Sequence, residues 1–271
     1  AQVTAAMPGS NGAFDWRYVR WERGAPTPVD GVVIHEEQIR IHVNGLELVS
    51  FMCTPTNLDL LALGFLRSEG IIHDIADVRL IHTCPSETCV EVWLRDAQAV
   101  VPRRAIVTSG CGGGVTFDDL SQRVPPVESA VTMTARQVND AMRQLMDVAT
   151  LYRLTRGVHT SALSDGQQII AQAEDVGRHN TIDKLWGYCL QQGIPTADRI
   201  LLATGRISSE MLNKAAKMRI PVVASRTSPT SLSVQLAREW NITLIGYARG
   251  ENFNVYAAGD RIFPTGTLEQ S

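Results

Sequence analysis

The alternation of short apolar runs with helical patterns in the second half of the chain constrains its fold most. Extended runs occur at 158–164, 167–173, 198–204, 220–225, 242–248 and 253–258, and helical patterns at 179–193, 208–219 and 228–240. A strand–helix–strand–helix–strand order predicts a parallel sheet flanked by helices. We therefore expect an α/β domain over residues 134–271, opened by a helix that Thr134 begins with a capping box, "TARQ".

The first hundred residues follow a different pattern, with extended segments around a single helix. The expected elements are a hairpin over 29–52 that turns at Asn44-Gly45, a helix over 56–69, and strands at 77–84 and 89–96. Thr56 is the expected helix cap and Gly70 the expected helix end. This order predicts a small α+β domain over residues 26–100. Residues 1–25 are expected to be loose, with the aromatic stretch 14–21 as a candidate docking strand.

Composition and charge exclude several classes of protein. The 271 residues suit two modest domains, and a formal net charge of −3 gives no basic field for nucleic acid. No apolar run reaches the roughly 18 residues that a membrane span needs, and the first residues lack the pattern of a signal peptide. Five cysteines at irregular spacing argue against a disulfide framework and for a reducing compartment. We therefore expect a cytoplasmic protein.

A long irregular segment, residues 101–133, separates the two halves and carries Cys111 between Gly110 and three further glycines. Such a long loop in a compact protein is usually functional or disordered. Glycines widen the backbone conformations open to the loop, and a thiol between small residues is accessible for reaction. Cys111 is therefore the candidate reactive thiol, and a flexible linker that happens to hold a cysteine is the alternative.

The remaining cysteines are expected to be structural, because free cysteine behaves as a small buried hydrophobe. The stretch "HTCPSETC", with His82, Cys84 and Cys89, imitates a zinc site. Its C-x4-C spacing crosses an expected hairpin turn, so three ligands would have to come from two antiparallel strand ends. The chain also lacks the H-x-E of zinc deaminases. We therefore expect no metal site.

The segment Glu174–Lys184, "EDVGRHNTIDK", is the densest polar cluster and lies where an expected strand meets a helix. Gly177 allows a tight turn, and backbone N–H groups at a helix start favour an anion. Because open α/β sheets bind ligands at the carboxyl ends of their strands, we prefer an anion site to a solvated helix entry with local ion pairs. The expected donors are Arg178, His179 and Lys184, with Asp175 and Asp183 orienting them.

Three more loops end at the same edge of the expected sheet. They are "ATGRISSE" from Ala203, "ASRTSPTS" from Ala224 and "GYARGEN" from Gly246. Together they line one rim with hydroxyls, backbone donors and arginines, which suits a phosphorylated ligand. Neither a Walker nor a GxGxxG pattern occurs, which argues against an ordinary ATP or NAD site. The candidate binding residues on these loops are Arg206, Ser208, Arg226, Thr227 and Arg249, joined by His159 at the start of the first strand.

Six segments, in this order, resemble one family. They are "GFLRSEGII", "SGCGG", "GVHTSAL", "EDVGRHNTIDKL", "GRISSEMLNKAAKMRIPVVASRTSPTSLSVQLA" and "TLIGYARGENFNVY". They are similar to the FdhD/NarQ family of sulfurtransferases that formate dehydrogenase needs for activity. The similarity covers about residues 29–263.

The resemblance implies a function and a fold. Family members accept sulfur from a cysteine desulfurase as a persulfide and pass it to the molybdenum (or tungsten) bis-guanine-dinucleotide cofactor of formate dehydrogenase. Their second domain has a cytidine-deaminase-like three-layer α/β/α fold without the zinc chemistry. The matching motifs make Cys111 the persulfide carrier, with GDP as a fragment mimic of the bound cofactor and no tightly held metal. Relatives form homodimers. The matching cofactor-contact residues are Tyr247, Ala248, Arg249, Gly250, Glu251 and Asn252.

Two departures from the family pattern matter. Many relatives keep a second cysteine in the loop, where this chain has Gly114. A release step through an internal disulfide of that loop is then unavailable, while a relay through one persulfide remains. Some relatives read lysine-proline-glycine-arginine where this chain reads "RGEN". Two alternatives to the sulfurtransferase stay open: a non-catalytic chaperone that binds the cofactor or the apoenzyme, and a zinc nucleotide deaminase.

Overall fold

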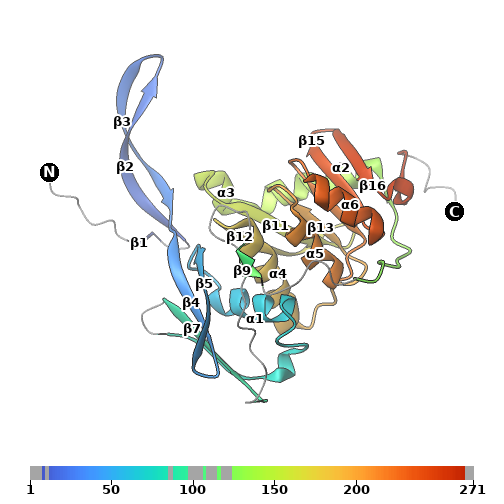
Figure 1. Ribbon diagram of the computed structural model, residues 1–271. Coiled ribbons are helices and arrows are strands. Elements are labelled where there is room, and N and C mark those ends of the chain that lie inside the picture. Colours follow the sequence, from blue (N-terminus) through green and yellow to red (C-terminus); the bar gives the residue numbers. More distant parts are fainter. Residues whose placement is uncertain are drawn as a thin grey trace.

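The computed structural model describes residues 8–9, 12–84, 88–96, 106–107, 115–116 and 124–265. A larger body follows the second half of the chain, a smaller body follows the first, and a long hairpin projects from the smaller one (Figure 1). None of the helices in these ranges combines the length and the apolar character that crossing a bilayer requires.

The larger body is built on a six-stranded sheet in the order β12-β11-β13-β14-β15-β16. The strands are β11 His159–Ser164, β12 Ile169–Asp175, β13 Ile200–Ala203, β14 Val222–Ser225, β15 Thr243–Arg249 and β16 Asn252–Ala257. Only β13, β14 and β15 run parallel, while β12, β11 and β16 pair antiparallel with their neighbours. The expectation of a parallel sheet is therefore wrong at both flanks. The short links β11–β12 and β15–β16 are the reason, because tight turns can join only antiparallel neighbours.

Helices cover both faces of this sheet. They are α2 Ala135–Val148, α4 Arg178–Gln192, α5 Ser209–Lys217 and α6 Ser231–Glu239, with the short α3 Thr150–Thr155 after α2. Leu201 and Val223 of the sheet pack with α4, α5 and α6, whereas Leu202 and Val222 pack with α2 on the opposite face. The predicted three-layer α/β/α arrangement is confirmed. The capping box at Thr134 is confirmed as well, since Gln137 N donates to Thr134 Oγ1 over 3.2 Å.

The smaller body packs one helix, α1 Leu58–Ser68, on a four-stranded sheet of order β5-β4-β7-β6. Its strands are β4 Glu37–Val43, β5 Leu46–Cys53, β6 Val78–Thr83 and β7 Cys89–Leu94. A 3-10 turn, Ile75–Asp77, leads into β6. Gly70, at φ 71°, follows the helix end as predicted. Thr56 is not the cap, because the helix begins at Leu58 and the Thr56 hydroxyl instead accepts from Lys184 Nζ at 3.5 Å.

Two glycines bring the bodies into direct helix contact, α1 against α4. A Cβ on Gly64 would lie 1.7 Å from the Asp183 carbonyl oxygen, and one on Gly187 would lie 2.0 Å from that of Leu60. Any side chain at either position would push the helices apart. The mutual orientation of the two bodies therefore depends on these two residues.

The segment expected to be loose forms half of a hairpin instead. Strand β2, Ala13–Glu22, pairs along its whole length with β3, Ala25–Ile34, and at its start with β1, Pro8–Gly9. The ribbon extends away from both bodies (Figure 1). The most exposed of its large apolar side chains is Trp21, with 68% of its surface accessible. The aromatic stretch thus lies on a strand, as expected, but the strand has its own partner.

Cys84 and Cys89 form a disulfide that links the end of β6 to the start of β7. The expectation that these cysteines are unpaired is wrong. Cys84 N donates to the Cys89 carbonyl over 2.9 Å, so the strand ladder holds the two residues at a Cα separation of 5.3 Å. Such a separation lies within the range that a disulfide spans. Cys53 and Cys189 are free and buried, as expected.

The structure describes only part of the segment 101–133, which carries Cys111 and separates the two halves of the chain. Two short strands, β8 Ile106–Val107 and β9 Val115–Thr116, pair antiparallel with each other. Residues 108–114, with Cys111, connect them and lie outside the described part of the chain. A further short pair joins β10 Met133–Thr134 to β17 Ile262–Phe263 in the larger body.

Candidate anion-binding site

The predicted rim is formed where β13 and β14 end. Ser225, the last residue of β14, donates from Oγ to the Gly205 carbonyl over 2.7 Å. Arg226 N donates to the Ala203 carbonyl at the end of β13 over 3.1 Å. Ile207 and Pro229 then form a single bridge in parallel register. The two post-strand loops are thus fastened together before α5 and α6 begin.

His159 and Arg178 approach the same point from the antiparallel flank. A Cβ on Gly205 would lie 2.9 Å from His159 Nδ1 and 3.3 Å from Arg178 Cβ, so only glycine leaves room for both. Burial, and after it the charge of Arg178, lowers the pKa of His159 below its usual range. His159 is therefore neutral at neutral pH, and its imidazole adds polarity to the rim without adding charge.

His179 joins the first turn of α4 to the start of α5. Its Nε2 lies 3.1 Å from Ser208 Oγ and 3.0 Å from Glu210 Oε2. Ser208 Oγ also accepts from Met211 N and so caps α5. Burial lowers the pKa of His179, although Glu210 counteracts part of the effect. Both candidates, His179 and Ser208, are thus engaged in the protein's own hydrogen bonds, and their described role is to fix the rim.

The turn between β15 and β16 closes on the loop after β14. Arg249 Nε donates to the Arg226 carbonyl over 2.8 Å, and Tyr247 N donates to the Thr227 carbonyl over 3.1 Å. Tyr247 has a φ of 54° and is 48% exposed. The structure therefore brings together Arg226, Thr227, Tyr247 and Arg249, four residues expected to meet the ligand.

Other predicted site residues face different surroundings. Arg206, Gly250, Glu251 and Asn252 are exposed, and Ala248 is buried. Glu251 lines a polar cavity of about 510 Å³ together with Arg136 and Arg143 of α2. The "GYARGEN" motif therefore extends from the rim toward the α2 side of the sheet.

Two predicted members of the site lie elsewhere. Lys184 is fully buried against Asp175, with Nζ 2.6 Å from Oδ2, at the contact between the two bodies. Asp183 is buried beside Lys214, whose Nζ lies 2.6 Å from Asp183 Oδ2. The prediction that Lys184 and Asp183 serve the anion site is wrong. Residues 178–187 of α4 are all buried, so Asp183 and Lys184 face the protein interior, which the sequence pattern alone did not reveal.

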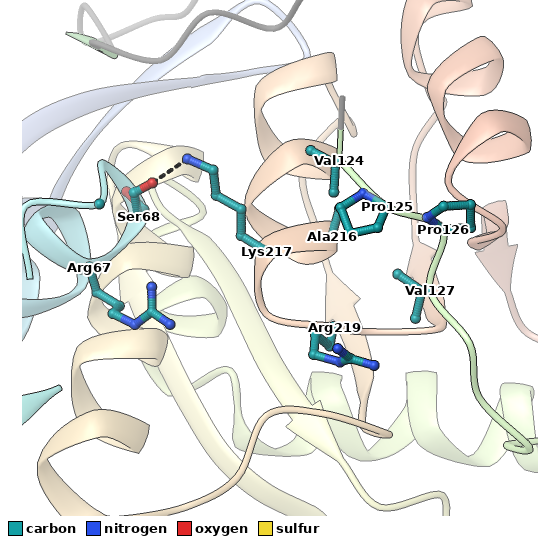
Figure 2. A pocket seen from close by; sticks show the side chains of 10 residues that line it. Arg67, Ser68, Val124, Pro125, Pro126, Val127, Ala216, Lys217 and Arg219 are labelled. Carbon is teal, nitrogen blue, oxygen red and sulfur yellow. Dashed lines mark hydrogen bonds between the residues drawn. The ribbon is translucent and has the colours of Figure 1, made fainter. Parts of the chain in front are cut away.

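A second basic cavity, not foreseen from the sequence, lies between the ends of α1 and α5 (Figure 2). Its volume is about 350 Å³, with Arg67, Lys217 and Arg219 as its cationic side chains. Lys217 Nζ donates to the Ser68 carbonyl. Residues 124–127, which begin the last described range of the chain, form the apolar wall of this cavity. Arg67 lies in the last turn of α1, whereas Lys217 ends α5 and Arg219 follows two residues later, so only the packing of the two bodies places Arg67 beside the other two.

The fold and the rim define an α/β protein with an arginine- and hydroxyl-bearing strand edge. Residues 34–263 match the model of the FdhD/NarQ family. The chain belongs to this family.

Individual relatives agree with that assignment. A "Sulfur carrier protein FdhD" of Staphylococcus haemolyticus is 35% identical over 252 residues, covering 91% of this chain and 96% of the relative. One of Staphylococcus aureus is 35% identical over 249 residues, covering 90% and 94%. A crystal structure of a formate dehydrogenase accessory protein from Desulfotalea psychrophila superposes with a TM-score of 0.77 at 28% identity, covering 93% of this chain and 100% of that one.

Proposed function

We propose that this chain is a sulfurtransferase that supplies sulfur to the molybdenum bis(molybdopterin guanine dinucleotide) cofactor of formate dehydrogenase. The observation that carries the proposal is the family match, since relatives aligned over nine tenths of the chain are named sulfur carrier proteins. The strand-edge rim supports it, because arginines and backbone donors suit a ligand with pyrophosphate groups.

The sulfur-carrying residue in this proposal is Cys111, which lies outside the described residues. Its thiolate attacks the outer sulfur of a persulfide on a cysteine desulfurase. A new S–S bond forms at Cys111, the donor's S–S bond breaks, and the donor cysteine leaves as a thiolate. The relay needs no oxidant or reductant up to this point. Cys53 and Cys189 are unsuited to this role because burial raises the pKa of their thiols to about 12 and about 11.

The rim then serves as the binding site of the cofactor, which is the substrate. Exposed Arg249 and the half-buried Arg226 and Thr227 stand beside one another on adjacent loops. A guanidinium group can donate two parallel hydrogen bonds to phosphate oxygens, and the Thr227 hydroxyl adds a neutral donor. A homodimer in the cytoplasm fits the proposal, because the cofactor carries two guanine-dinucleotide halves for two rims.

A sulfur-loading experiment tests the proposal. The protein is incubated with a cysteine desulfurase and cysteine, and intact-mass and peptide spectra are recorded with and without a reductant. We expect one reducible sulfur atom on the peptide that contains Cys111, and none on Cys111→Ala. Cys189→Ala is the matched control and should load like the wild type.

The same variants separate a relay from a passive chaperone. Extracts lacking the protein are supplemented with each variant, and formate dehydrogenase activity is measured. A relay predicts that Cys111→Ala fails to restore activity while Cys189→Ala succeeds. Equal sulfur loading and equal activation by Cys111→Ala would contradict the relay and favour a non-catalytic chaperone that binds the cofactor.

A further inference from the structure

The outer face of the small four-stranded sheet gathers ligand-type side chains from all four strands. The strand register pairs His42 of β4 with Glu47 of β5 and with Glu91 of β7, and pairs Glu91 in turn with His82 of β6. The opposite face of the same strands, with Ile41, Val43, Val90 and Val92, packs on α1. The row of acidic and imidazole groups therefore lies on the side of the sheet away from this core.

His42 and Glu91 converge with a third ligand-type side chain, that of Cys89. His42 Nδ1 lies 2.7 Å from Glu91 Oε1. Cys89 stands two residues before Glu91 on β7, on the same face, and its Sγ completes a group whose three ligand atoms lie within 4.8 Å of one another. All three side chains are half-buried, so they are held in place and still reachable from solvent. Cys84, the other half of the Cys89 disulfide, is bonded to Cys89 but is not a member of this group.

We propose that the outer face of this sheet is a redox-gated site for a divalent metal ion of the zinc type, with His42, Cys89 and Glu91 as ligands, water in the fourth position and the Cys84–Cys89 disulfide as the gate. Imidazole nitrogen, thiolate sulfur and carboxylate oxygen form the ligand set that Zn²⁺ takes in tetrahedral sites. Bonds of about 2.0–2.2 Å to nitrogen and oxygen would leave the ligand atoms of His42 and Glu91 roughly 3.4 Å apart. The observed contact is 2.7 Å, so the two side chains would have to separate by a fraction of an ångström to admit the ion.

The disulfide is the gate. While the Cys84–Cys89 bond is intact, neither sulfur can act as a thiolate ligand. A dithiol reductant breaks that bond with two electrons, becomes a disulfide itself, and leaves two thiols, with that of Cys89 beside His42 and Glu91. The metal ion then displaces the proton of the Cys89 thiol, which passes to the buffer, and binds the thiolate. Reoxidation by a disulfide reagent, which is itself reduced to thiols, reforms the Cys84–Cys89 bond and releases the ion.

This proposal replaces the expectation that the chain holds no metal. The cysteines lie more than forty residues after His42 in the chain, so the "HTCPSETC" stretch alone suggested His82 as the third ligand. The parallel pairing of β4 with β7 brings in His42 instead. His82 is exposed on the edge strand and stands outside the converging group, which makes it a matched control.

The test uses the full chain with Cys111→Ser, so that the loop thiol cannot bind metal. Protein reduced anaerobically, freed of reductant, is titrated with Zn²⁺ against a chelating dye and with Co²⁺ followed by absorbance. We expect one equivalent of tight binding and a thiolate-to-cobalt charge-transfer band in the reduced protein. The oxidised protein should bind about tenfold more weakly or worse and show no such band.

Point variants distinguish this site from metal bound elsewhere. His42→Asn and Cys89→Ser should each weaken Zn²⁺ binding by about tenfold or more, while His82→Asn should leave it unchanged. Cys84→Ser keeps the Cys89 thiol but cannot form the internal disulfide, so it should bind Zn²⁺ without prior reduction, unlike the wild type. Circular dichroism identifies variants that fail to fold, and for those the cobalt spectrum of Cys84→Ser decides. Equal binding by reduced and oxidised protein, or full binding by a folded His42→Asn variant, overturns the proposal.

Discussion

Lys184 and Asp175 form an ion pair that is buried between the two bodies, with Nζ 2.6 Å from Oδ2 and both side chains at most 1% exposed. The Asp175 carboxylate also accepts from Thr54 N over 3.1 Å and from Asn180 Nδ2 over 2.8 Å. Lys184 Nζ donates in addition to the Thr54 carbonyl over 2.9 Å. A residue of the smaller body, Thr54, is thus bound to both charges of a pair that belongs to the larger body.

Removal of one charge of the Lys184–Asp175 pair should therefore lower the free energy of unfolding. Lys184→Met leaves a buried carboxylate without its cation, and we expect a loss of about 3–5 kcal/mol in unfolding free energy. Urea denaturation measures it. Asp140→Asn, which breaks a surface pair with Arg143, should cost no more than about 0.5 kcal/mol. The double variant Asp175→Asn/Lys184→Met should lose less than the sum of the two single losses. Equal effects of Lys184→Met and Asp140→Asn would show that the buried pair is not needed.

The contact of α1 with α4 should be equally sensitive to volume. Gly64→Ala and Gly187→Ala place a methyl group into the backbone of the other helix, and we expect each to destabilise the protein by about 3 kcal/mol or more. Alanine favours helices, so helix propensity alone would predict the opposite sign. Gln191→Ala, on the exposed side of α4, serves as the control and should change stability little. A melting temperature unchanged by Gly64→Ala would contradict the close crossing.

These two contacts mark the limit of what the sequence could predict. Helix ends at Thr134 and Gly70 were predictable because capping and left-handed glycines depend on neighbouring residues. The hairpin at Asn44-Gly45 was predictable for the same reason, and both residues have a positive φ. The roles of Lys184 and Gly64 depend on residues more than a hundred positions away, and no local pattern carries that information.

The candidate site likewise contains residues that could be assigned from the sequence and residues that could not. Arg226, Thr227, Tyr247 and Arg249 could be assigned to one rim because carboxyl ends of parallel strands share an edge. The internal roles of His179 and Ser208 could not be foreseen, because a hydrogen bond between two helix starts requires the packed arrangement of α4 and α5. The pairing of His42 with Glu91 likewise depends on strand register across the smaller sheet.

The buried cysteines should be unreactive in the native protein. Burial raises the pKa of Cys53 to about 12 and that of Cys189 to about 11, so neither forms appreciable thiolate at pH 8. We expect iodoacetamide to leave both unlabelled for hours in the native state and to label both quickly in urea, as followed by peptide mass spectrometry. Rapid native labelling of Cys53 would show that the strand end opens to solvent and would contradict its burial.

Stability should also depend on the His179 imidazole in a defined pH range. Its folded-state pKa is lowered, chiefly by burial, so the unfolded chain binds the proton more readily. The contribution of neutral His179 to folding stability is therefore present above about 6.5, the pKa of histidine in the unfolded chain, and is lost as the pH falls below that value. Urea melts of wild type and His179→Gln at several pH values measure this. The stability difference between them should narrow as the pH falls from 7.5 toward 5. A constant difference would contradict protonation-linked burial.

Ligand binding at the rim should depend on Arg249 more than on arginines elsewhere. GDP, as a fragment of the proposed cofactor, offers a pyrophosphate to the loops that Arg249 and Arg226 join. Because a charge-assisted hydrogen bond contributes about 1.5–3 kcal/mol, Arg249→Ala should weaken GDP binding by roughly tenfold or more in calorimetry.

Arg79→Ala, on β6 of the smaller sheet, is the matched control and should bind GDP like the wild type. Because phosphate contacts are screened by salt, the deficit should shrink as ionic strength rises. Equal affinity of the two variants would place the nucleotide site away from the rim, and equal competition by ADP would contradict guanine recognition.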